Sequence, residues 1–63
     1  MSDFRKLSFL HQNDYFVFNK ELFKVDWCLK DNNAINMKTN KPCYINENEQ
    51  VKWLRWLKNI HIF

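Results

Sequence analysis

Two histidines, two cysteines and seven acidic residues are the side chains that could perform catalysis or hold a metal. His11 lies three residues before Asp14, and such a pair could act as a general base beside a substrate. The remaining carboxylates show no paired spacing typical of acid–base chemistry. A chain without glycine also has no glycine-rich phosphate loop. We therefore interpret His11 as a solvated loop residue and expect no catalytic residues and no enzyme.

The two cysteines, Cys28 and Cys43, do not form a CxxC pair. A structural zinc site needs four ligands, and the addition of His11 and His61 produces no recognised ligand spacing. Secreted disulfide frameworks normally carry four or more cysteines. We expect no metal, no cofactor, and two reduced, packed cysteines in a cytoplasmic protein.

Residues suited to binding are densest in VKWLRWLK, residues 51–58, where tryptophans and basic residues alternate with aliphatic ones. Tryptophan, tyrosine and arginine dominate the energy of protein interfaces. We expect Trp53 and Leu57 on the buried side of this run. The predicted partner-binding residues are aromatic or basic: Lys52, Arg55, Trp56, Lys58 and Tyr44. A homodimer that hides a sheet edge or the tryptophan face is a variant of this interpretation.

Nucleic-acid binding is the alternative, because small barrels stack bases on exposed aromatic residues beside lysine and arginine. The residues predicted for this role are Tyr15, Lys24, Lys30 and Lys41. A net charge of +3 permits such binding without requiring it. Asp26 also interrupts the lysines of its segment. No apolar run approaches the roughly 20 residues of a membrane span, and the N-terminus does not resemble a signal peptide.

Short antiparallel strands must position these residues within a single small domain, residues 1–63. YFVF (15–18) is aromatic and β-branched, and residues 22–30 alternate strictly between apolar and polar positions. Residues 34–37 and 42–46 are predicted as further strands, separated by asparagine-rich turns. So small a meander must curl into a barrel or be covered. We expect LSFL (7–10) and part of 49–59 to cover it.

Residues 49–59 permit two interpretations. Trp53, Trp56 and Leu57 share one face of a helix, and Asn46 followed by Glu49 resembles a capping box. As a strand, the alternate residues from Val51 onward would share a face instead. Periodicity favours a short C-terminal amphipathic helix, with a last strand as the alternative.

The stretch KLSFLHQNDYFVFNKELFKVDW resembles the opening of small SH3-like barrel proteins encoded by tailed phages. Their pattern LxxLxxGDxFxFNxxLYxV is followed by a YIN…V strand, and the resemblance covers residues 6–54. The matching residues are Leu7, Leu10, Asp14, Phe16, Phe18, Asn19, Leu22, Phe23, Val25, Tyr44, Ile45, Asn46 and Val51.

Asn13 replaces the usual glycine of this pattern, so we expect a left-handed backbone there. The resemblance implies a mainly β, SH3-like curled sheet in which Val51 and Trp53 belong to the last strand. It also implies an accessory protein that binds, and modulates or inhibits, a host protein in the host cytoplasm.

Overall fold

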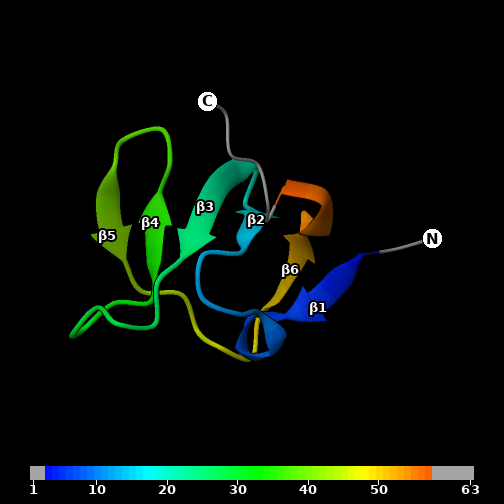
Figure 1. Ribbon diagram of the computed structural model, residues 1–63, viewed down its shortest axis with the longest axis horizontal. Helices are drawn as coiled ribbons and strands as arrows, with labels where there is room; N and C mark the ends of the chain where they lie inside the picture. Colours follow the sequence, from blue (N-terminus) through cyan, green and yellow to red (C-terminus); the bar gives the residue numbers. More distant parts are fainter. Residues whose placement is uncertain (1–2, 58–63) are drawn as a thin grey trace.

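The computed structural model describes residues 3–57, with Trp56 described only in its backbone. This part of the chain forms one antiparallel sheet of six strands in the order β1-β6-β2-β3-β4-β5 (Figure 1). The strands are β1 (Phe4–Lys6), β2 (Tyr15–Phe18), β3 (Glu21–Val25), β4 (Ala34–Asn36), β5 (Lys41–Cys43) and β6 (Gln50–Trp53). Two 3₁₀ turns, η1 (Leu7–Phe9) and η2 (Arg55–Leu57), accompany them. The mainly β prediction is confirmed, and an SH3-like curled sheet fits this order.

Asparagine supplies most of the left-handed backbone that the turns require. Among the described residues, φ is positive at Asn13 (72°), Asn19 (54°), Lys20 (65°) and Asn40 (60°). The left-handed conformation predicted for Asn13 is therefore confirmed. Asn19 and Lys20 form the two-residue loop between β2 and β3, where positive φ at both positions matches the twist of the paired strands.

The strand predicted over residues 22–30 is correct only as far as Val25. Beyond it, the Trp27 backbone N–H donates to Gln12 Oε1 at 2.7 Å, and the Cys28 N–H donates to Asp26 Oδ1 at 3.0 Å. The Trp27 indole N–H donates to the Leu10 carbonyl at 3.0 Å. The backbone N–H groups of Trp27 and Cys28 therefore donate to side chains and not to a neighbouring strand, so the strand ends before them.

The last-strand interpretation holds for Gln50–Trp53, and the helical one is wrong there. β6 lies between β1 and β2 and pairs with both, so a helix would forfeit hydrogen bonds on two sides. Asn46 does not cap a helix. Its Oδ1 accepts from the Asn48 N–H at 2.8 Å and closes a turn instead. Residues 58 and 59 of the predicted segment lie outside the described residues.

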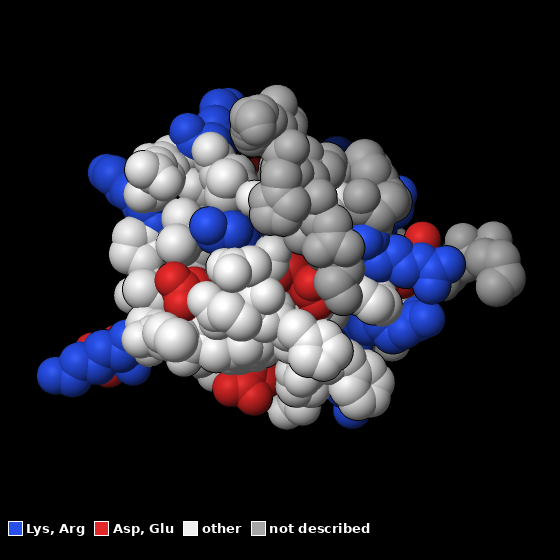
Figure 2. Space-filling model, viewed as in Figure 1, with Lys and Arg blue, Asp and Glu red and all other residues white. Residues whose placement is uncertain are grey.

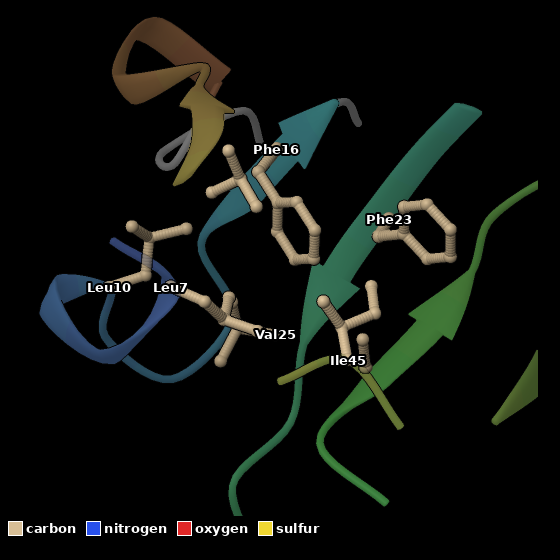
Figure 3. Close-up of a cluster of buried hydrophobic side chains, with 8 residues drawn as sticks. Leu7, Leu10, Phe16, Phe23, Val25 and Ile45 are labelled. Carbon is tan, nitrogen blue, oxygen red and sulfur yellow. The ribbon is translucent and has the colours of Figure 1, made fainter. Parts of the chain in front are cut away.

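The core lies on one side of the sheet (Figure 3). Two segments cover it: one begins at η1 and contributes Leu7 and Leu10, and the other follows β5 and contributes Ile45. The buried apolar residues are Leu7, Leu10, Phe16, Phe23, Val25, Ala34, Ile45 and Val51. The Phe16 and Phe23 rings stack at 5.3 Å between centroids. The apolar cover predicted for residues 7–10 is confirmed by Leu7 and Leu10. Trp53, predicted to be buried, packs partly buried against the core.

A buried amide fixes the segment that follows β5. Asn33 Nδ2 donates to the Ile45 carbonyl at 2.6 Å, and the Ile45 N–H donates to Asn33 Oδ1 at 2.9 Å. The Asn33 side chain thereby satisfies both backbone groups of a buried residue, as a neighbouring strand would. The predicted strand over 42–46 ends at Cys43, because Ile45 bonds to this side chain rather than to a strand.

Replacement of Lys20 by glycine should stabilise the protein. Lys20 holds a φ of 65°, which costs a residue with a Cβ about 1 kcal/mol and costs glycine almost nothing. We expect Lys20→Gly to raise the free energy of unfolding by about 0.5–1 kcal/mol in urea titrations. A valine at the same position should lower it, and equal stability of the two variants would contradict the turn assignment.

Loss of the Asn33 amide should destabilise the protein strongly. Asn33→Ala leaves two buried backbone groups without partners, and each unmet group costs about 1–3 kcal/mol. The neighbouring control, Asn32→Ala, should change the free energy of unfolding by about 0.5 kcal/mol or less. Chemical denaturation of both variants is the measurement. Equal losses in the two would show that Asn33 does not brace Ile45.

Candidate functional site

The side of the sheet opposite the core carries residues from all six strands. Successive strand residues point to opposite sides, and the register assigns each residue to a side. We call the side opposite Phe16 and Phe23 the outer face. Its strand positions are Phe4, Lys6, Tyr15, Val17, Leu22, Lys24, Ile35, Pro42, Gln50 and Lys52.

Apolar side chains occupy much of this outer face. Phe4 is 50% exposed and Leu22 is 36% exposed, while Tyr15, Val17 and Ile35 are half-buried. Exposed apolar groups collected on one surface are typical of interaction sites. The core already has its own cover from residues 7–10 and Ile45, so the outer-face groups are not needed to complete it.

Lysines alternate with the apolar residues in two rows across the strands. One row runs Phe4, Lys52, Val17, Leu22 through β1, β6, β2 and β3. The second runs Tyr15, Lys24, Ile35, Pro42 through β2, β3, β4 and β5. Each of the two lysines therefore has apolar neighbours on both adjacent strands. Their aliphatic stems can lie along these neighbours while the ammonium groups reach solvent.

The charge on the strand positions of the outer face is entirely positive. Lys6, Lys24 and Lys52 are its charged members, and no acidic residue shares this face within the described strands. Asp26 follows β3 directly, near Lys24. Hydrogen bonds from the Gln12 side chain and then the Cys28 N–H lower the pKa of Asp26, and the Lys24 charge adds to this. That carboxylate already accepts hydrogen bonds from Gln12, in the segment before β2, and from Cys28 of its own loop.

Only part of the predicted partner-binding set lies on this face. Lys52 lies on it, in the strand next to the β1 edge. Arg55 follows in η2, exposed, with its Nε 3.9 Å from Asp3 Oδ1. Tyr44 is 61% exposed but follows β5, at the edge of the sheet opposite β1. The Trp56 side chain and Lys58 lie outside the described residues.

The residues predicted for nucleic-acid binding are also divided. Tyr15 and Lys24 are direct partners between β2 and β3 on the outer face. Lys41 is paired with Asn36 on the other side of the sheet, and Lys30 lies in the turn after β3. Figure 2 shows acidic side chains between the basic ones in that view, so no continuous basic track crosses it. The structure thus joins Tyr15 and Lys24 with Lys52, a residue predicted for the other role.

The sequence prediction did not include the apolar members of the outer face, Val17, Leu22 and Ile35. Their placement follows from strand geometry, because successive residues point to opposite sides and Val17 and Leu22 therefore lie opposite the phenylalanines. The sequence carries no signal for the pairing of β6 with β2, and this pairing places Lys52 beside Val17.

The histidine–aspartate pair has a structural role in its turn. Asp14 is buried, and its Oδ2 accepts from the His11 backbone N–H at 2.8 Å. The His11 imidazole is exposed, with Nδ1 3.8 Å from that oxygen. Within residues 3–57, no group of three or more histidine, cysteine or acidic side chains could hold a metal. Cys28 and Cys43 are free thiols, and partial burial followed by the Glu21 charge raises the pKa of Cys43.

Comparison with known proteins yields no relative: no family model, no curated protein and no solved structure matches this chain. In the described part of the chain, no helix has the length and apolar character needed to cross a membrane.

Removal of the Gln12 side chain should raise the pKa of Asp26 toward its ordinary value of 3.8. Because the folded-state pKa lies below that value, this carboxylate stabilises the fold fully above it and loses its effect as the pH falls through the folded-state pKa. Titration of the Asp26 carboxyl carbon by NMR checks Gln12→Ala. Lys24→Gln is the control and should raise this pKa less, since the Lys24 charge is a smaller cause. The reverse order would contradict the assignment.

Proposed function

We propose that this protein is a non-enzymatic binding protein of the phage accessory type, which docks on a host protein in the host cytoplasm and modulates or inhibits it. The supporting observation is the outer face, where exposed apolar side chains and lysines alternate on a rigid sheet. The resemblance to phage SH3-like proteins supports the viral role.

The composition of the outer face favours a protein over a nucleic acid. Bases stack on aromatic rings, and Tyr15 and Phe4 are the aromatic residues at its described strand positions. The other apolar groups named near the lysines, Val17, Leu22 and Ile35, are aliphatic. Aliphatic side chains offer no stacking surface to a base, but they pack well against apolar side chains of another protein.

Docking on a sheet face also requires little reorganisation. The strand backbones are held by hydrogen bonds on both sides in β2, β3, β4 and β6. A surface that is ordered before binding loses little conformational entropy in the complex. Inhibition then follows by occupation: the protein covers the partner surface on which it docks. Arg55 lies next to this face in the chain, and Trp56 and Lys58 remain predicted members of the site from the sequence.

The cross-strand pair of Tyr15 and Lys24 supports nucleic-acid binding as the second candidate, because a ring beside a cation can hold one nucleotide. Affinity for a single strand should then fall steeply as salt is added. Retention of oligodeoxythymidine at low salt, with no host protein captured, would favour this alternative.

A tagged copy of the protein should capture one dominant protein from a bacterial host lysate, and Leu22→Asp should abolish the capture. Leu22 lies beside Val17 in the row that runs from Phe4 across the outer face, and a carboxylate there would disrupt apolar packing against the partner. Phe9→Asp is the matched control, since Phe9 is 67% exposed in η1, outside that face. Circular dichroism verifies the fold of both variants.

Two outcomes of this capture experiment would contradict the proposal. One is a lysate from which no protein is enriched. The other is equal loss of the partner in Leu22→Asp and Phe9→Asp, both folded, because a site on the outer face does not involve Phe9.

A further inference from the structure

We propose that the partner surface bound by the outer face is acidic, with apolar side chains between its carboxylates. This inference rests on the proposed function and defines the chemistry of the partner. Lys24 and Lys52 would pair with the carboxylates, while Val17, Leu22 and Ile35 would contact the apolar groups.

The first support is that the outer-face lysines have no ion-pair partner within the described chain. Within residues 3–57, the side chains at ion-pair distance are Arg55 with Asp3 and, only when the imidazole is protonated, His11 with Asp14. Neither pair involves Lys6, Lys24 or Lys52. Asp26, which follows β3 directly, accepts hydrogen bonds from the Gln12 side chain and the Cys28 N–H. Cations on an apolar surface, without an ion-pair partner in the described chain, favour a partner of opposite charge.

The second support is the spacing of the two central lysines. Lys52 on β6 and Lys24 on β3 are separated by β2, which places their strands about 10 Å apart. Val17 and Tyr15 lie on the strand between them. Because Lys52 faces Val17 and Lys24 faces Tyr15, the two lysines are also offset by two residues, about 7 Å, along the strands, so their backbones lie about 12 Å apart. A complementary surface presents two carboxylates about 12 Å apart with an apolar group between. Residues seven apart on a helix, at about 10.5 Å, come close to this spacing, and the long lysine side chains can span the difference.

A second copy of the chain does not fit this surface. Face-to-face association would bring the lysines of one outer face against those of the other, and like charges in contact are unfavourable. A nucleic acid would satisfy the lysines but leave the aliphatic groups exposed or against phosphates. An acidic protein surface satisfies both kinds of group.

The probe for this inference is a fluorescent random copolymer of glutamate and tyrosine, compared with polyglutamate and with oligodeoxythymidine. Fluorescence anisotropy measures the affinity of each for the intact protein. We expect the copolymer to bind most tightly, because it alone offers carboxylates together with apolar groups. Tighter binding of oligodeoxythymidine, or binding of no probe, would overturn the inference.

Two double variants test the position of the site. Lys24→Glu/Lys52→Glu reverses the charge of the outer face and should weaken copolymer binding roughly tenfold or more. Lys30→Glu/Lys41→Glu changes the net charge equally, from +3 to −1, away from that face, and should have about a twofold effect or less. Equal weakening by the two would overturn the inference, because it would show that only net charge matters.

Competition separates this inference from the proposed function. The copolymer should displace the captured host protein from the tagged chain, whereas a neutral polymer such as polyethylene glycol should not. A partner that is captured through Leu22 but resists the copolymer and survives Lys24→Glu/Lys52→Glu would overturn the acidic chemistry and leave the proposed function standing. Absence of any captured protein would overturn the proposed function itself.

Discussion

The fold depends on the pair of hydrogen bonds between the Asn33 side chain and the backbone of Ile45. β5 is an edge strand, and the chain must leave it, cross the core and return as β6 between β1 and β2. The Asn33 amide meets the backbone needs of Ile45 at the start of that crossing. Further along, the Leu7 and Ser8 N–H groups donate to the Glu49 and Glu47 carbonyls at 2.9 and 3.0 Å. These contacts let a chain without glycine close its core and place β6 in the sheet.

The elements that the sequence predicted are those whose determinants are local. Tyr15–Phe18 is aromatic and β-branched, and Phe23, Lys24 and Val25 alternate between apolar and polar. The asparagines at 13, 19 and 40 have the left-handed backbone expected of turns. The secondary-structure predictions are wrong where contacts with residues distant in the sequence determine the local structure. Gln12 ends β3 from across the chain, and β6 overrides a helical periodicity because two strands pair with it. Neither contact has a signature within its own segment.

The candidate site follows the same division. The alternation of side-chain direction along a strand is enough to place Lys24 and Leu22 on the side away from the core. Residue type alone identified Tyr15 and Lys52 as suited to binding. The insertion of β6 beside β2 was required to join them, and no sequence pattern predicted it. The outer face therefore combines residues that the sequence assigned to two different functions. Its lysines among aliphatic groups match the needs of an acidic protein surface better than those of a nucleic acid.

Methyl cross-saturation in the complex with the captured partner tests the central claim most directly. With the partner protonated and this protein deuterated except at its methyl groups, saturation passes only to methyl groups at the interface. The outer face predicts strong transfer to Val17, Leu22 and Ile35, and little to Leu7, Leu10 and Val25 in the core. Transfer that spares Val17, Leu22 and Ile35 while reaching methyl groups elsewhere on the surface would contradict it.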